Sequence, residues 1–248
     1  MAKVIRQLKG HSTSKVELIK ENDMIIVRKT GNIQRNLERL DKLEHIGLKT
    51  PKILEIYGDS YDMEYIPNQD IKTYLENNNI THLIWFLQYL FGTLSKNTFE
   101  KDYTAIYQAK LDSFPFDKYR LPFTKKQLLD KLPKTLPASE YHGDLTLENI
   151  LYSIAEKSFV LIDPLTTEYD SYVFDMAKLR QDIQCRWFIR NDNVYFDAKL
   201  KKINDELSNI PHYHDDSLLI LMLMRVLPYT QNEKDKTFIE SEIKKLWK

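Results

Sequence analysis

Two acids and one amide, separated by short intervals, are the side chains of this sequence best suited to chemistry on a phosphate group. Asp144 and Asn149 lie within HGDLTLENIL, and Asp163 follows in VLIDP. Between them, the apolar runs 150–152 and 159–162 flank a polar turn, a pattern that predicts a β-hairpin. A hairpin would bring all three oxygen-bearing side chains to one edge. Such groups suit a hard cation such as Mg²⁺ and a phosphate ester.

Turn formation alone accounts poorly for these polar residues. Asp and Asn favour turns for local reasons, which would explain the composition of the stretch 141–164 but not its joint spacing. The segment His212–Asp216, HYHDD, lacks helical i, i+4 spacing and a cysteine partner, so it predicts a turn at a helix start and not a metal site.

Composition favours an ordinary globular protein without a nucleic-acid or membrane partner. The 248 residues include 36 Lys and Arg against 36 Asp and Glu, so the formal net charge is zero. The single cysteine, Cys185, cannot form an intramolecular disulfide, which favours a reducing compartment. The N-terminal residues lack the apolar stretch of a signal peptide, and the longest apolar segments are too short to span a bilayer. We therefore expect a cytoplasmic location.

The first 66 residues predict a small β-rich lobe of about five strands and one helix. Residues 1–30 have β-type runs at 16–19 and 24–29, and further strands are expected at 52–55 and 62–66. The segment 32–46 repeats leucine along one face and predicts the helix. Near the start, Lys15 resembles the lysine of a P-loop only superficially, because the flanking glycine and Ser/Thr are replaced.

From residue 67 the chain predicts a larger helical lobe, 67–248, that carries the polar hairpin. The segment 83–94 is apolar on most sides, as a helix buried in a core would be. A loop is expected at 111–123. Further helices are expected at 124–132, 172–189, 196–207, 215–227 and 234–247. Asp215 and Asp216 lie where acids stabilise a helix N-terminus.

HGDLTLENIL followed by VLIDP resembles the catalytic loop and metal-binding strand of the aminoglycoside phosphotransferase and choline kinase family. These are small-molecule kinases with a protein-kinase-like fold. Gly143 after the histidine and Pro164 after the second acid distinguish the stretch from the H-R-D and D-F-G signatures of protein kinases. The later YVFDMAKL, 172–179, also resembles a helix start of this family. The resemblance implies an α+β fold with a small β-rich N-lobe and a larger helical C-lobe.

The resemblance also implies roles for the residues of the central stretch. Asp144 would be catalytic and would accept or orient the proton of the attacking hydroxyl. Asn149 and Asp163 would hold Mg²⁺ on the phosphate oxygens. His142 would support the loop and not act as the base, and Asp175 would hold the loop through its backbone.

Lys29 is the residue expected to contact the α and β phosphates of ATP, because its strand resembles the lysine strand of kinases. Its neighbour Arg28 is the alternative. Successive side chains of a strand point to opposite faces, so only one of the two can face inward.

The helix glutamate that pairs with this lysine in the family has several candidates here. Glu38 is the favoured candidate for this glutamate, and Glu44 is the second candidate. Strict spacing from the family's leucines instead places Asn36 at the position of the glutamate. The spacing of Glu38 from Lys42 equally fits a solvated helix face with an i, i+4 ion pair.

Adenine would bind to the backbone of a hinge segment between the lobes, and amides of an N-terminal loop would cover the phosphates. The hinge residues are Met63, Glu64, Tyr65 and Ile66, and the loop residues are Ser12 and Ser14. The loop lacks the G-x-G-x-x-G of protein kinases, which the family often does without.

Together these expectations describe an ATP- and Mg²⁺-dependent phosphotransferase acting on a hydroxyl of a small molecule such as a sugar, an amino alcohol or an aminoglycoside. The alternatives are a nucleotide-binding pseudokinase, an interaction domain, and an atypical protein kinase, which the absence of an A-P-E signature disfavours. The charge of the acceptor stays open, because acids that would favour a cationic substrate interleave with Arg186 and Arg190. Those acids are Glu168, Asp170, Asp182 and Asp192.

Overall fold

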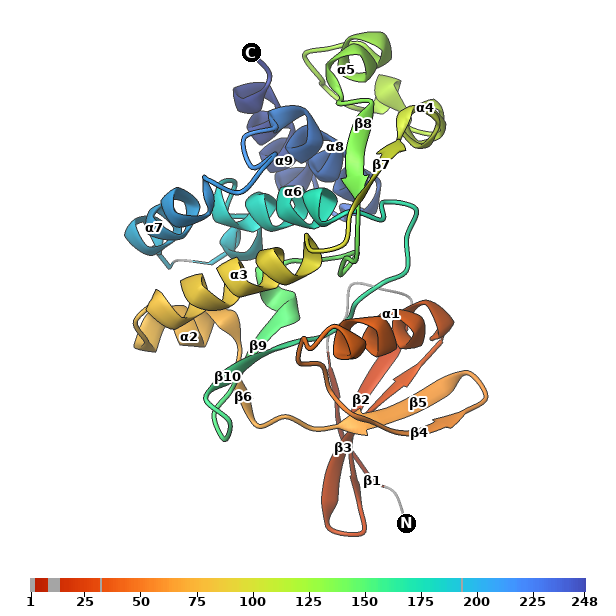
Figure 1. Cartoon of the computed structure of the whole chain (residues 1–248), viewed down its shortest axis with the longest axis vertical. Helices are drawn as coiled ribbons and strands as arrows, with labels where there is room; N and C mark the ends of the chain where they lie inside the picture. Colours follow the sequence, from red (N-terminus) through yellow and green to blue (C-terminus); the bar gives the residue numbers. More distant parts are fainter. Residues whose placement is uncertain (1–2, 9–13, 32, 193) are drawn as a thin grey trace. The chain divides into compact units, whose positions relative to one another are not determined.

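The computed structural model of the protein describes residues 3–8, 14–31, 33–192 and 194–248 and has an α+β fold (Figure 1). The chain divides into two compact units. The first comprises Met1–Tyr74 and Glu148–Thr166, and the second comprises Leu75–Leu147 and Thr167–Lys248. The lobe boundary expected near residue 67 stays a prediction, while the hairpin of the central stretch belongs to the first, β-rich unit.

A five-stranded antiparallel sheet forms most of the first unit, in the order β1-β2-β3-β5-β4. Its strands are β1 (Lys3–Leu8), β2 (Lys15–Glu21), β3 (Met24–Thr30), β4 (Ile53–Tyr57) and β5 (Ser60–Glu64). Helix α1 (Gln34–His45) packs on one face of this sheet through its leucine stripe (Figure 1). The strands and the helix predicted for residues 1–66 are therefore confirmed to within a few residues.

The register of the sheet decides which side chains face α1. Val27 of β3 lies opposite Leu18 of β2 and Met63 of β5, and these three pack with Leu40 of α1 in one apolar cluster. Lys29 lies two residues beyond Val27 and therefore points to the same face, where it is buried. Strand alternation thus selects Lys29 as the inward residue.

Arg28 points to the opposite face of the sheet and pairs with Asp62 of β5. Both guanidinium contacts, from Nε to Oδ1 and from Nη2 to Oδ2, measure 2.8 Å. Burial raises the pKa of Asp62, but the hydrogen bonds and charge of Arg28 outweigh it and lower that pKa below its ordinary value. This bidentate pair fixes the register of the two central strands.

Asp62→Asn is expected to reduce stability at neutral pH by about 1–3 kcal/mol, because it leaves a charged hydrogen-bond donor without its anionic partner. The folded pKa is lowered, so the carboxylate stabilises the fold above the unfolded value of about 3.9, and this contribution is lost as pH falls through the folded pKa. Urea unfolding between neutral and acidic pH should show wild type and variant converging below about pH 4. The control is Asp205→Asn, which removes the exposed Lys201–Asp205 pair. If the free energies of unfolding of wild type and Asp62→Asn differed by the same amount at all pH values, the carboxylate of Asp62 would not have this stabilising role.

The predicted hairpin is present as β9 (Ile150–Ser153) and β10 (Ser158–Leu161), with the short strand β6 (Asn68–Gln69) added beside β9. Tyr152 and Phe159, which are cross-strand neighbours, pack their rings against Tyr74 with centroid distances of 4.8 and 5.0 Å. Aromatic pairs of this geometry add to the stabilisation from burial. The hairpin is thereby fixed within the first unit.

Helices dominate the second unit. Helix α6 is buried along almost its whole length, and α8 is apolar from Leu218 to Met224. Of the helices in the described ranges, none is long and apolar enough to cross a membrane. The elements of the rest of the chain are α2 (Ile71–Asn77), α3 (Thr81–Leu94), β7 (Phe99–Asp102), α4 (Thr104–Asp112), α5 (Lys125–Lys131), β8 (Thr135–Ala138), α6 (Tyr172–Ile183), α7 (Asp197–Leu207), α8 (Asp216–Val226) and α9 (Glu233–Leu246).

Two details of the helical unit bear on the predictions. Asp215 caps α8 by accepting from the backbone amides of Ser217 and Leu218, which confirms the expected helix start. Helix α6 ends at Ile183 and not at residue 189, because the chain turns through a left-handed residue, Arg186, with a φ of 59°. The pairing of β7 with β8 joins segments that show no clear strand pattern, so the sequence did not indicate it.

Candidate functional site

The base of the hairpin holds Asn149 and Asp163 at the same end. The backbone amide of Ile162 donates to the carbonyl of Asn149 at 3.0 Å, so the residues just outside the two strands are joined. Asp163 has a φ of 54°, in the left-handed region that Asp and Asn tolerate better than most residues. Residues held in this region concentrate at functional sites.

Lys29 contacts Asp163 directly. The Nζ–Oδ1 distance is 2.8 Å, with the lysine side chain 4% exposed and the aspartate side chain 40% exposed. Tyr61, opposite Lys29 on β5, lies in the same environment: burial raises the pKa of its phenol, and the charge of Asp163 raises it further. The structure therefore brings the expected phosphate-binding lysine and an expected metal ligand together, with the carboxylate accessible to solvent.

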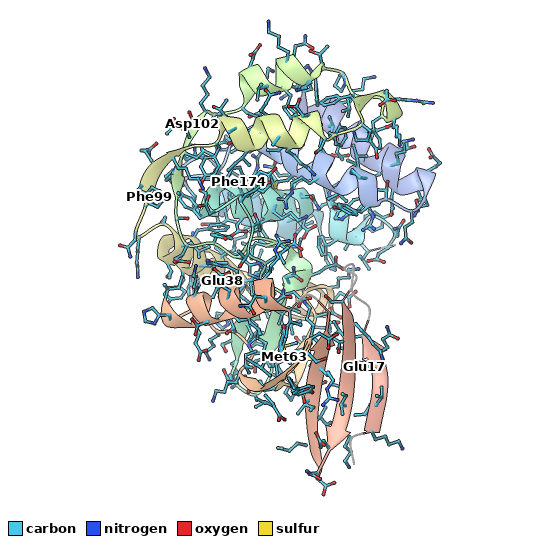
Figure 2. All side chains as sticks on the ribbon, turned by 90° about the vertical axis from the view of Figure 1, so that its right-hand side faces the viewer. Glu17, Glu38, Met63, Phe99, Asp102 and Phe174 are labelled. Atoms are coloured by element: carbon cyan, nitrogen blue, oxygen red, sulfur yellow. The ribbon has the colours of Figure 1, made fainter. Side chains whose placement is uncertain are left out.

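The expected ion pair between Glu38 and Lys29 is not what the structure shows. Within the described ranges, the carboxylate of Glu38 (labelled on α1 in Figure 2) contacts Lys42 at 3.1 Å and the hydroxyl of Thr166 at 3.2 Å. The hydrogen bond from Lys42 is the main reason that the pKa of Glu38 is lowered. The physical reason for the difference is that Glu38 and the reserve candidate Glu44 lie on the exposed side of α1.

Asn36, at the position given by strict spacing, faces the segment that follows Asp163. It is 5% exposed, and its Nδ2 donates to the carbonyl of Pro164 at 2.7 Å. Arg35 also contacts the same segment, because its Nε donates to the carbonyl of Thr166 at 2.6 Å. Helix α1 thus holds the backbone that follows Asp163 and does not contact Lys29 through a carboxylate.

The four proposed hinge residues lie at the end of β5 and just beyond it. Met63 is part of the apolar cluster under α1, and Tyr65 packs against that cluster. Glu64 is joined to Lys52 by its backbone amide and by its carboxylate, each at 3.0 Å. The carbonyl of Ile66 accepts from the side chain of Asn68 at 2.7 Å. Binding of adenine by this segment stays a prediction.

The N-terminal loop is only partly covered by the structure. Ser12 lies outside the described residues. Ser14 lies against Gly31, where an added Cβ would come within 3.3 Å of the Ser14 Cα. Gly31 also has a φ of 128°, which disfavours other residues, so this close approach of two backbone segments requires glycine.

In the second unit, the loop that carries Asp144 is held by Asp175 of α6. The carboxylate of Asp175 accepts the backbone amides of His142 and Gly143, the latter at 2.8 Å, and Gly143 has a φ of 90°. The contact confirms the expected anchoring of this loop through its backbone. Asp182, two turns further along α6, accepts from the amide of Leu147 at 2.7 Å. One face of α6 therefore holds both ends of the loop.

Asp175→Asn is expected to destabilise the fold by about 1–3 kcal/mol, because an amide oxygen replaces two acceptors and leaves one buried N–H without its partner. Hydrogen exchange of the His142 and Gly143 amides should accelerate by more than the loss of global stability alone would cause. The matched control is Asp130→Asn on the exposed side of α5. Unchanged protection of both amides in the variant would contradict the anchoring role.

Asp144 forms an ion pair with Lys178, a residue that the sequence reasoning missed. The Nζ–Oδ1 distance is 3.2 Å, and the side chains are 15% and 42% exposed for Lys178 and Asp144 respectively. Burial raises the pKa of Asp144, but the charge and hydrogen bond of Lys178 outweigh it, so the pKa lies below its ordinary value. The spacing of three residues between Asp175 and Lys178 on one predicted helix was an available signal, since such residues share a face.

The donor set at the hairpin base fits Mg²⁺ bound together with a phosphate ligand. Across the residues that the structure describes, no group of three or more His, Cys, Asp and Glu side chains is arranged to hold a metal ion by itself. Mg²⁺ is usually bound through one or two carboxylates, with waters and substrate phosphates completing its shell. One half-exposed carboxylate, Asp163, and one amide, Asn149, are donors of this kind.

Solved structures with a similar fold include three kinases of small molecules. A thermostable mutant of aminoglycoside phosphotransferase APH(4)-Ia matches with a TM-score of 0.67 and 10% identity over 99% of this chain and 94% of that chain. An ethanolamine kinase of Plasmodium vivax matches with a TM-score of 0.59 and 10% identity over 100% and 82% of the two chains. A choline/ethanolamine kinase family protein of Mesorhizobium loti matches with a TM-score of 0.57 and 14% identity over 99% and 86%.

The chain has the fold of the small-molecule kinases. A scan of family models and a search of curated proteins gave no match, so this assignment comes from structure and not from sequence identity. One APH(4)-Ia structure contains ADP and hygromycin B, which shows that a protein with this fold binds a nucleotide and a small molecule together. The fold implied by the resemblance in the central stretch is therefore the fold that the structure has.

Proposed function

We propose that the protein is an ATP-dependent phosphotransferase that transfers the γ-phosphate to a hydroxyl of a small molecule. The observation that supports this proposal most directly is the contact between Lys29 and Asp163. A buried strand lysine and a half-exposed aspartate at the end of a second sheet meet at 2.8 Å, although 133 residues separate them along the chain. The small-molecule kinase fold supports the same conclusion.

In this proposal the first unit binds the nucleotide. Lys29 supplies a fixed positive charge to the α and β phosphates, and the backbone of residues 63–66 contacts the adenine. Asn149 and Asp163 would hold Mg²⁺, which when bound neutralises charge on the phosphate oxygens. The backbone amide of Ser14 is also proposed to contact a phosphate of the nucleotide. Glu38 is not retained as the partner of Lys29, because its carboxylate is engaged by Lys42 and Thr166.

Asp144 is the proposed catalytic residue in the second unit. Its lowered pKa keeps the carboxylate ionised near neutral pH, so it can accept a hydrogen bond from the attacking hydroxyl and orient it. A bond forms between the hydroxyl oxygen and the γ-phosphorus, and the bond from that phosphorus to the β–γ bridging oxygen breaks. ADP leaves, and the hydroxyl proton passes to Asp144. Asp175 positions the residue by fixing the loop.

The test is a screen of hydroxyl compounds with Mg·ATP that measures ADP release against a control without acceptor. At least one class of sugars, amino alcohols or aminoglycosides should raise ADP release above that control. Nucleotide-dependent thermal stabilisation without ADP release across the panel would instead indicate a pseudokinase. Absence of any Mg·ATP binding would exclude both and favour an interaction domain.

The proposed cellular setting is the cytoplasm, and it is supported by the single cysteine and by the balance of charges. Cys185 is the chain's single cysteine and is buried, which raises the pKa of its thiol to about 12 and keeps it unreactive. A thiol without a disulfide partner suits the cytoplasm, where ATP-dependent reactions on small molecules take place. The balanced charge gives no reason to include nucleic acid or a membrane among the partners.

A further inference from the structure

Helix α3 carries a stripe of exposed aromatic residues on the side opposite its buried face. Trp85 is 61% exposed, and Tyr89, about one helical turn further on, is 55% exposed. The exposed ring of His82 lies 5.7 Å from the ring of Trp85, measured between centroids. Two more exposed residues, Gly92 and, just after the helix, Lys96, continue this side of α3. These five residues are called the α3 stripe below.

The spacing of the α3 stripe is that of a seam between two helices. Residues 82, 85, 89, 92 and 96 follow one another at intervals of 3, 4, 3 and 4, as the a and d positions of a heptad repeat do. A stripe this narrow is the form in which one helix meets one other helix. Helix α7 only borders it, through Gln88, whose Nε2 donates to the carbonyl of Glu206 at 3.4 Å. The exposed seam is therefore open to a helix of another molecule.

Helix α3 also lacks the charges that a helix face in contact with water ordinarily carries. Its 14 residues, THLIWFLQYLFGTL, include no Asp, Glu, Lys or Arg on either face. Surface helices usually place charged residues on their solvent side. Depletion of charge, together with exposed Trp and Tyr, is typical of the core of a protein–protein interface. The composition of α3 thus agrees with its spacing.

Gly92 has no packing reason within the chain. Among the described residues, a Cβ added at Gly92 would meet no neighbouring atom within 4 Å. A glycine inside a helix lowers stability relative to alanine, because its backbone loses more conformational freedom on folding. At this position of the α3 stripe the missing side chain leaves a notch between Tyr89 and Lys96. Such a notch lets a second molecule approach the helix closely.

We propose that α3 pairs with α3 of a second copy of the chain, antiparallel and related by a two-fold axis. In an antiparallel seam the a positions of one helix face the d positions of the other, so each contact occurs twice. Trp85 of each copy then packs against Tyr89 of the other, and His82 of each copy fills the notch at Gly92 of the other. A parallel pair would place Gly92 opposite Gly92 and leave that layer empty.

The balance of charge permits this association between identical chains. The formal net charge is zero, so two copies do not repel each other as strongly charged proteins do. The seam covers only about three helical turns, which is less than the roughly 1,600 Å² of a standard interface requires. We therefore expect a weak dimer, with a dissociation constant of about 1–100 μM. This inference is independent of the proposed phosphotransferase function.

The first experiment measures self-association of the full chain by sedimentation equilibrium. It compares wild type with Trp85→Lys, Tyr89→Lys and the matched control Tyr229→Lys, which replaces a tyrosine that is 80% exposed outside the α3 stripe. Wild type and control should form the dimer equally well. Each stripe variant should weaken it by about tenfold or more, because a charge would be buried at the centre of the pair. Wild type that stays monomeric up to about 1 mM would overturn the proposal, and so would equal dissociation constants in all four proteins.

A second variant, Gly92→Gln, separates the fold of the monomer from the pairing of copies. Glutamine favours a helix over glycine and has open space at this position, so thermal unfolding of the dilute, monomeric protein should occur at an equal or higher temperature. The same side chain would fill the notch and should weaken the dimer by about tenfold or more. An unchanged dissociation constant in this variant would contradict the role of Gly92.

Cysteine cross-linking tests the antiparallel register. The variants His82→Cys and Gly92→Cys are oxidised mildly, each alone and as a mixture, while the native Cys185 is buried. The proposed register brings position 82 of one copy close to position 92 of the other, so a disulfide-linked dimer should form mainly in the mixture. Efficient linkage within either variant alone would indicate a parallel pair and overturn the register. Linkage in none of the three samples would exclude this pairing of α3.

Discussion

Asp144→Asn is expected to lower the rate of acceptor-dependent ADP formation by about 10²- to 10⁴-fold, the range associated with loss of a general base. The substitution preserves the size of the side chain but removes the carboxylate that would accept the hydroxyl proton. Nucleotide affinity should change little, because the residues proposed to bind ATP belong to the other unit. Steady-state kinetics and calorimetric titration with Mg·ATP together measure the two effects.

A second variant, Lys178→Met, removes the ion pair at 3.2 Å and keeps the carboxylate of Asp144. Loss of the ammonium should shift the acid limb of the pH–rate profile upward, because the charge and hydrogen bond of Lys178 are the largest of the influences that lower the pKa of Asp144. If Lys178 only stabilised the fold, its replacement would leave the pH–rate profile unchanged. Near-normal activity of Asp144→Asn on the true acceptor would remove this residue from the mechanism.

Asp163→Ala is expected to weaken Mg·ATP binding by more than about tenfold, a loss typical of changes in a metal-binding set. The variant removes the only carboxylate proposed to hold Mg²⁺ and also leaves the buried ammonium of Lys29 without its partner at 2.8 Å. Titrations with ATP are compared in Mg²⁺ and in EDTA. Wild type should lose affinity in EDTA, and the variant should show much less difference between the two conditions.

Two further variants separate metal binding from the loss of charge. Asp41→Ala removes an exposed acid on α1 and should behave as wild type. Lys29→Met should weaken nucleotide binding but keep its dependence on Mg²⁺, because Asp163 and Asn149 remain. An unchanged magnesium dependence in Asp163→Ala would exclude this residue from the metal site.

Local patterns in the sequence were sufficient to predict much of the fold. The hairpin at 150–161 follows from two apolar runs around a polar turn, and the burial of Lys29 in preference to Arg28 follows from strand alternation. The start of α8 at Asp215 follows from its capping side chain. Each of these features depends on residues close together in the chain.

Features that depend on distant segments were not predictable in the same way. The pairing of β7 with β8 joins strands on either side of α4 and α5, and neither strand has a strong pattern of its own. A carboxylate is the usual partner of a kinase lysine, and for this reason the sequence favours Glu38 over Asn36. The structure instead uses the amide of Asn36 to hold the backbone at Pro164, a contact that depends on the approach of α1 to that segment.

The β-rich unit is built from two stretches of chain, residues 1–74 and 148–166, with the first stretch of the helical unit, residues 75–147, between them in the sequence. During synthesis, strand β6 must therefore wait for its partner β9, which is made about 80 residues later, or roughly 4 to 16 s at ordinary rates of translation. Throughout this interval the ring of Tyr74 lacks Tyr152 and Phe159. The nascent N-terminal segment therefore exposes apolar surface until the hairpin is made, and a fragment ending near residue 74 should not reach the native packing of this unit.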